Sequence, residues 1–152
     1  MAGIRLVNTG STTKTNDFLC GKKELGKIER FMVDGQHEPV SHYCHAVRAG
    51  ERIWISGMVG IDQSGNIPTD TVDQFQTAMN NLDSVLRKAG GKSEDIVKVM
   101  VFLTDISDRA RINPIRQRYF GEHRPASTLV EVSKLVLPEL RVEIEAEAVV
   151  ID

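Results

Sequence analysis

The chain has few cysteines, few aromatic residues and no long apolar segment. Its two cysteines, Cys20 and Cys44, lie among 152 residues and are too few for a disulfide framework, so we expect both thiols to be reduced. No apolar run approaches the roughly 20 residues that cross a bilayer, and no hydrophobic signal segment opens the chain. These absences predict a cytoplasmic protein without a membrane partner.

The chain also lacks an excess of charge of one sign. It has 19 Lys and Arg against 21 Asp and Glu, a formal net charge of −2, and no basic cluster longer than a pair. Nucleic-acid-binding surfaces usually carry a basic face or stripe, so we expect no nucleic-acid partner and disfavour RNA cleavage. The length and the 41% hydrophobic content are sufficient for one domain with a substantial core.

The first 40 residues differ from the rest in having thinly spread apolar residues among polar ones and glycines. We interpret residues 1–40 as an N-terminal extension laid over a domain of residues 41–152. Within the extension, an edge strand in Ile4–Val7 and a short strand or turn near Ile28–Val33 are the only elements that the pattern suggests.

The domain opens with a pattern typical of strands. His42–Ala46 and Ile53–Ser56 predict two strands joined by a turn at Arg48–Glu51. Met58–Ile61 continues the second strand beyond Gly57. A glycine inside a strand indicates a bulge or a close approach of another group to the backbone.

The clearest helix signal is an apolar stripe at three- and four-residue spacing. It consists of Phe75, Ala78, Met79, Leu82, Val85, Leu86 and Ala89. Thr71 and Gln74 fit a capping box at its start, and Gly90-Gly91 ends it. The β-branched run Ile96–Leu103 predicts a central strand that is buried on both faces.

A second helix is predicted to end at Gly121. Asn113 as N-cap with Pro114 in the first helical position is the less costly start, because a start at Asp108 would place the proline inside the helix. Thr128–Val132 and Arg141–Val150 then form the last two strands. The order of elements predicts an α+β domain with helices on one face of a mixed sheet.

Several segments, in this order and spacing, resemble the RidA/YjgF family of reactive-intermediate (enamine/imine) deaminases over residues 41–150. They are Ile55-Ser56-Gly57, Asp95 to Asp105, Asn113 with Tyr119-Phe120, Pro125-Ala126, Glu131-Val132 and Val142 to Ala146. The resemblance implies a chorismate-mutase-like α+β fold, a mixed β-sheet with two helices packed on one face. It also implies a cofactor-free homotrimer with small-molecule sites in the clefts between its subunits.

The resemblance also implies roles for individual residues. Glu143 matches the glutamate that orients or activates a water molecule for attack on an imine carbon, and Tyr43 and Asn113 match residues that line or support the cleft. Glu131 is an alternative acid on the neighbouring strand. Ser127, two residues after the proline, occupies the place of an arginine that grips the substrate carboxylate in the family's deaminases.

With serine in place of arginine, this position lacks the planar, positively charged guanidinium group and has one hydroxyl donor instead. Arg124 could supply the missing charge. Cations from elsewhere in the assembly, with Arg48, Arg52 and Lys134 as candidates, could do so too. Alternatively, the substrate could be of the 2-aminomuconate type rather than a small amino-acid enamine. The expected function is hydrolysis of enamine/imine intermediates to 2-oxo acids and ammonia; the alternative is a non-catalytic ligand-binding or chaperone-like trimer.

A metal site is disfavoured by strand geometry. On an extended strand His42 and Cys44 face one way and His45 the other, and their spacing matches no zinc site. We therefore expect no metal, while His45, on the same face as Tyr43, remains a candidate for lining the cleft.

Overall fold

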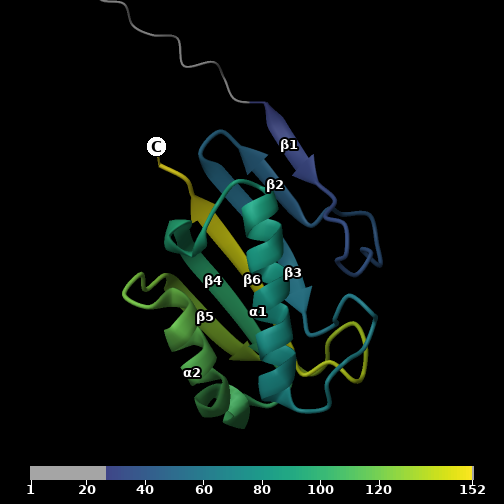
Figure 1. The fold of residues 1–152 in the computed structure, drawn as a ribbon. Coiled ribbons are helices and arrows are strands. Elements are labelled where there is room, and N and C mark those ends of the chain that lie inside the picture. The colour runs from purple at the N-terminus through teal and green to yellow at the C-terminus, as the bar shows by residue number, and fades with distance from the viewer. Residues whose placement is uncertain (1–26, 152) are drawn as a thin grey trace, which may run out of the picture.

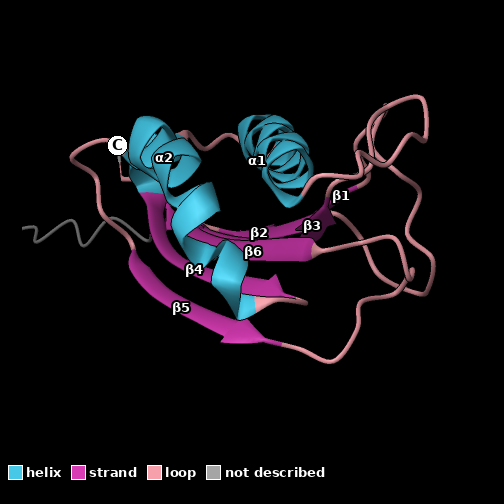
Figure 2. Cartoon of the chain, turned by 90° about the horizontal axis from the view of Figure 1, so that it is seen from below, coloured by secondary structure: helices cyan, strands magenta, loops and turns pink. Residues whose placement is uncertain are grey.

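The computed structural model describes residues 27–151, which form one six-stranded sheet with two helices on one of its faces (Figure 2). This confirms the expected α+β architecture; the strand suggested in Ile4–Val7 lies outside the described residues. The strands are β1 (Ile28–Phe31), β2 (Ala46–Ala49), β3 (Arg52–Val59), β4 (Ile96–Leu103), β5 (Ala126–Glu131) and β6 (Val142–Val149). The helices are α1 (Thr71–Lys88) and α2 (Arg109–Phe120), and short 3-10 turns cover Ser93–Asp95 and Ile106–Asp108.

The strands lie in the order β1-β2-β3-β6-β4-β5 (Figure 1). Only the β4–β5 pair is parallel; the other four pairs are antiparallel. A parallel step needs a crossover, and α2 supplies it, while α1 carries the chain from β3 over β6 to β4. Both crossovers run over the same face, so no helix formed by residues 27–151 lies over the other face of the sheet (Figure 2).

Helix α1 packs its apolar stripe into the core against the sheet, as the spacing predicts. All seven stripe residues are buried, with exposed fractions of 2% or less. The start of the helix differs from the prediction, because Asp70 is the N-cap and accepts a hydrogen bond from the Val72 amide. Gln74 is buried instead, and its side chain bonds the Pro68 and Glu139 carbonyls and the Arg141 amide, tying the loop before β6 to the helix.

The prediction for the start of α2 is wrong. The helix begins at Arg109, so Pro114 lies inside it and cannot donate to the carbonyl of Ala110. The first turn is held by other contacts, since Arg111 forms ion pairs with Asp108 and with Asp70 at the start of α1. The end of α2 at Gly121, with φ of 52°, agrees with the prediction.

The first predicted strand is displaced along the chain. β2 covers Ala46–Ala49 rather than His42–Ala46, because the turn is confined to the two residues between Ala49 and Arg52. β1 lies in the segment near Ile28–Val33 and pairs with β2 as an edge strand of the sheet.

His45, just before β2, is 4% exposed and serves the fold rather than a cleft. Its Nδ1 accepts from the Val33 amide at 2.9 Å, so Nε2 is the nitrogen that donates to the His37 carbonyl at 3.0 Å. The ring therefore fastens the loop of residues 32–37 to the sheet and lines none of the cavities described below.

Strand β4 is interior in the sheet, but within one chain only its helix-facing side is fully buried. Val99, Val101 and Leu103 on the helix-facing side are inaccessible, whereas Lys98, Met100 and Phe102, which alternate with them, are only partly buried. The expectation of burial on both faces is therefore not met within the described part of a single chain, because neither α1 nor α2 covers the second face.

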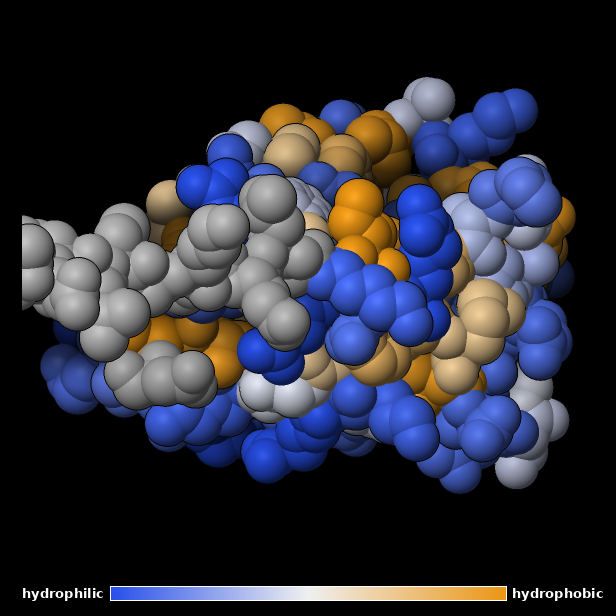
Figure 3. Space-filling view, turned by 90° about the horizontal axis from the view of Figure 1, so that it is seen from above, coloured by the Kyte–Doolittle hydropathy of each residue, from blue (hydrophilic) through white to orange (hydrophobic). Residues whose placement is uncertain are grey.

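In Figure 3, most of the surface that is coloured by hydropathy is hydrophilic, and hydrophobic side chains form separate patches on it. Over the part of the chain that the structure describes, no helix has the length and apolar character to cross a membrane.

Candidate functional site

A cavity of about 390 Å³ opens beside β3 and β6. Its lining includes Tyr43, Gly57 and Glu143, and Val136 and Leu137 of the loop before β6 complete one wall. Two of the predicted site residues, Tyr43 and Glu143, are thus brought together. We call this group of Tyr43, Gly57 and Glu143 the acid half-site.

Gly57 allows the Glu143 side chain to lie directly on the backbone of β3. A Cβ atom added to Gly57 would lie 1.7 Å from Glu143 Oε1, so no other residue fits without displacing the carboxylate. The pairing of β3 with β6 shifts register between Ile55 and Met58. This confirms the expected irregularity and close approach at Gly57, and the group that approaches is the candidate catalytic carboxylate.

The surroundings of Glu143 disfavour its ionised form. Partial burial raises the pKa of the Glu143 carboxyl, and the negative charge of Glu145 raises it further. A carboxyl group with a raised pKa exchanges protons more readily near neutral pH than an ordinary glutamate, which suits general acid–base chemistry.

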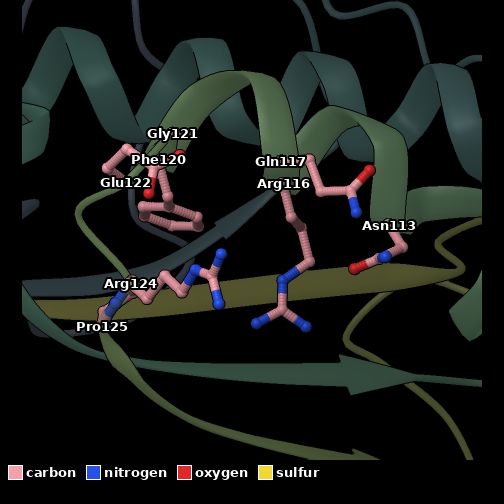
Figure 4. A pocket seen from close by; sticks show the side chains of 8 residues that line it. All are labelled: Asn113, Arg116, Gln117, Phe120, Gly121, Glu122, Arg124 and Pro125. Carbon is pink, nitrogen blue, oxygen red and sulfur yellow. The ribbon is translucent and has the colours of Figure 1, made fainter.

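Ser127 lies elsewhere, next to a cation that the sequence prediction missed. Its hydroxyl accepts a hydrogen bond from Nη2 of Arg116 on α2 at 2.6 Å. Arg116 lines a cavity of about 580 Å³ together with Asn113 and Arg124, and the two guanidinium groups extend into the same space below α2 (Figure 4). We call Asn113, Arg116, Arg124 and Ser127 the basic half-site.

Arg116 has an environment unlike that of the ion-paired arginines. It is half-buried, and burial lowers the pKa of its guanidinium. Among residues 27–151 no carboxylate forms an ion pair with it. The sequence contained a signal for Arg116. It follows Asn113 by three positions, and residues three apart lie on the same face of a helix. The wrongly predicted start of α2 obscured that relation.

The two half-sites lie on opposite faces of the sheet. In β4, Val99 is paired with Ser127 and Phe102 is paired with Glu143. Because side chains alternate along a strand, residues three apart point to opposite faces. Ser127 faces the helices and Glu143 faces the open side, so one small molecule cannot contact both within a single chain.

Two further candidates have structural contacts instead. Glu131 lines neither cavity, and its Oε2 accepts the Ile106 amide at 2.9 Å, which caps the short turn before α2. Arg48 donates to the Ala89 carbonyl at the end of α1. Within the described range of the chain, no three His, Cys, Asp or Glu side chains gather as metal ligands would.

Comparison with known proteins gives a consistent result. The family model described as Endoribonuclease L-PSP matches residues 35–150. A RutC family protein of Pyrococcus horikoshii is 36% identical over 122 residues, which is 79% of this chain and 96% of that protein. An Escherichia coli protein named 2-iminobutanoate/2-iminopropanoate deaminase is 34% identical over 114 residues, 72% of this chain and 88% of its own length.

Solved structures agree. The crystal structure of Escherichia coli TdcF with bound serine matches with a TM-score of 0.72 and 30% identity, covering 79% of this chain and 98% of TdcF. The family model matches most of this chain, and the alignments with the two relatives cover most of the length of each relative. Together these matches are sufficient to assign the family. The chain belongs to the RidA/YjgF family.

Proposed function

We propose that this protein hydrolyses reactive enamine and imine intermediates to 2-oxo acids and ammonia. The observation that carries the proposal is the placement of Glu143 on the backbone of Gly57, in a cavity beside Tyr43, with a raised carboxyl pKa. The 34% identical relative named as an iminobutanoate/iminopropanoate deaminase supports the same chemistry.

The proposed reaction requires little beyond positioning and proton transfer. The enamine first tautomerises to the imine. The Glu143 carboxylate then takes a proton from a water molecule as the water oxygen bonds to the imine carbon, and the imine nitrogen takes up a proton. The Glu143 carboxyl group gives its proton to the nitrogen of the resulting carbinolamine, the C–N bond breaks, and ammonia leaves. The carbonyl of the 2-oxo acid forms as the oxygen returns its remaining proton to the Glu143 carboxylate or to solvent. Holding substrate and water in contact accounts for much of the rate.

We propose further that the site is shared between subunits of a homotrimer. Glu143 and Ser127 face opposite sides of the sheet, so a cleft containing both needs the acid half-site of one subunit and the basic half-site of the next. The open face also carries large apolar side chains, with Trp54 39% and Val130 37% exposed. Such a surface is typical of one that a second subunit covers.

The basic half-site supports a substrate with more than one anionic group, of the 2-aminomuconate type. Arg116 and Arg124 extend into one cavity of about 580 Å³, which has room for a longer substrate than a three- or four-carbon imino acid. The relative TdcF was crystallised with serine, a ligand that carries one carboxylate. Two guanidinium groups in one cavity here favour a substrate with two carboxylates.

The direct test measures 2-oxo acid and ammonia released from freshly generated 2-aminoacrylate, 2-aminocrotonate and 2-aminomuconate. We expect the protein to accelerate hydrolysis above the rate in buffer, most of all for 2-aminomuconate. Glu143→Gln serves as the matched control, since it keeps the size of the side chain and removes the base. Equal rates with and without wild-type protein for all three substrates would contradict the proposal and favour the non-catalytic binding role.

A further inference from the structure

We propose that Arg116, held by Ser127, binds the carboxylate of the substrate, so that the anchoring charge comes from helix α2 rather than from strand β5. The inference deepens the proposed function and rests on it. Its starting point is the 2.6 Å hydrogen bond between Arg116 Nη2 and Ser127 Oγ, which places a guanidinium group beside a strand position that itself carries no charge.

The pair presents the donors that a carboxylate needs. A guanidinium has five N–H donors in a planar fork, and only one of them is used on Ser127. Because the serine oxygen accepts that bond, its own hydrogen is free to be donated to a ligand. The two side chains therefore offer several N–H groups and one O–H group at the same place, which suits the two oxygens of a carboxylate.

Burial and charge distinguish Arg116 from the other arginines of α2. Arg109 is exposed. Arg111 is already neutralised by Asp70 and Asp108, and Arg118 is exposed and donates to Gln76 of α1. Arg116 is half-buried, and in the described part of the chain it has no carboxylate partner. Desolvation without a counter-charge is unfavourable for a cation, so an anionic ligand gains more here than at an exposed arginine.

The place of the pair in the fold fits a substrate-binding role. Ser127 lies on β5, one of the two edge strands of the sheet, and Arg116 lies one helical turn after Asn113, which lines the same cavity. The small serine leaves the space that the guanidinium occupies. An arginine at position 127 would compete for that space, so the two ways of supplying the charge exclude each other.

The test measures binding of 2-oxobutanoate, a 2-oxo acid that is not turned over, to the full-length protein by calorimetry. We expect Arg116→Met to weaken binding by about ten- to a hundredfold, the loss typical of charge-assisted hydrogen bonds, and Arg116→Lys to weaken it less. Arg118→Met, on the same helix but outside the cavity, should bind as the wild type does. Binding of butanone, which lacks the carboxylate, should not respond to Arg116→Met.

An exchange variant tests the relocation itself. Ser127→Arg added to Arg116→Met should restore binding of 2-oxobutanoate, whereas Ser127→Arg alone should not strengthen it. Unchanged binding in Arg116→Met, or no detectable binding by wild type, would overturn the inference. A circular dichroism spectrum and melting temperature matched to wild type establish that a loss is local, and Arg116→Lys provides the test if Arg116→Met does not fold.

This binding test is separate from the test of turnover. Binding of 2-oxobutanoate that depends on Arg116, without acceleration of any imine hydrolysis, would refute the deaminase and leave the anchor standing. Turnover by wild type with an unchanged KM in Arg116→Met would refute the anchor and leave the deaminase standing.

Discussion

The acid and basic half-sites differ in how firmly the fold fixes their central group. Glu143 lies on an interior strand and rests on the backbone of Gly57, where a Cβ atom would displace it. Arg116 reaches its position from an exposed helix on a long side chain and is held by one hydrogen bond to Ser127. In the proposed mechanism, the reacting carboxylate is therefore specified by strand register, while the anchoring charge can be supplied from either of two neighbouring elements.

The comparison predicts the largest effect at Glu143. Glu143→Gln removes the proton acceptor, and we expect kcat/KM for imine hydrolysis to fall by about 10²–10⁴-fold. Rates of ammonia release, corrected for hydrolysis in buffer, measure the fall. Binding of 2-oxobutanoate should change little, because the carboxylate of this ligand is expected to bind to the basic half-site. Turnover at the wild-type rate would remove Glu143 from the mechanism.

The next effect comes from the backbone that supports the carboxylate. Gly57→Ala places a methyl group where Glu143 Oε1 lies, and a displacement of about 1 Å typically costs about a hundredfold in rate. Gly65→Asn is the matched control, since Gly65 has open space around its Cα and a φ of 82° that asparagine tolerates. Full activity in Gly57→Ala would mean that the contact with Gly57 does not position the carboxylate.

The pH dependence of activity sharpens the comparison. Because burial and Glu145 raise the pKa of Glu143, kcat/KM should rise with pH through a midpoint above that of an ordinary glutamate. Glu143→Gln should lack this limb. Initial rates measured between pH 4 and 8, after subtraction of the rate in buffer, give the midpoint of this rise. A rise of kcat/KM with pH that persists in Glu143→Gln would assign the titration to another group.

The same shift predicts the sign of a stability effect. With a folded-state pKa above the unfolded one, the contribution of Glu143 to stability is present at low pH and is lost as the pH rises through the folded-state value. Glu143→Gln should therefore gain stability relative to wild type as the pH rises from 4 to 7. Urea unfolding at the two values measures the gain, and a relative loss at pH 7 would contradict the assigned shift.

The smallest effect on activity is expected at Glu131, which belongs to neither half-site. Glu131→Ala should leave kcat/KM unchanged but lower the free energy of unfolding by about 0.5–2 kcal/mol, the usual cost of losing a capping hydrogen bond. Urea unfolding and turnover measured on the same preparation separate the two. A large loss of activity with unchanged stability would return Glu131 to the list of catalytic candidates.

Much of the fold could be predicted because its signals are local. The buried stripe of α1 follows from helical spacing, and the strand pattern of β3 with its glycine indicated the irregularity at Gly57. The start of α2 could not be found in this way. The first turn of the helix, ahead of its proline, includes Arg111, which forms ion pairs with Asp108 and with the distant Asp70. The contact with Asp70 is a tertiary one and has no local signature in the sequence.

The candidate site was only half predictable for a related reason. Glu143 and Tyr43 were identified by resemblance, and the structure places them in one cavity. Arg116 departs from the pattern that the resemblance supplies, so only its spacing from Asn113 on a correctly placed helix could have indicated it. The placement of Glu143 and Ser127 on opposite faces depends on how β4 pairs with both of its neighbouring strands. No local sequence pattern indicates that pairing.

A crystal structure of the protein with 2-oxobutanoate tests the central claim most directly, because it shows which chains surround the ligand. The account predicts a ligand between two copies of the chain, with Glu143 of one copy near the carbonyl carbon and Arg116 and Ser127 of its neighbour on the carboxylate. A ligand bound wholly by groups on one face of a single chain would contradict it.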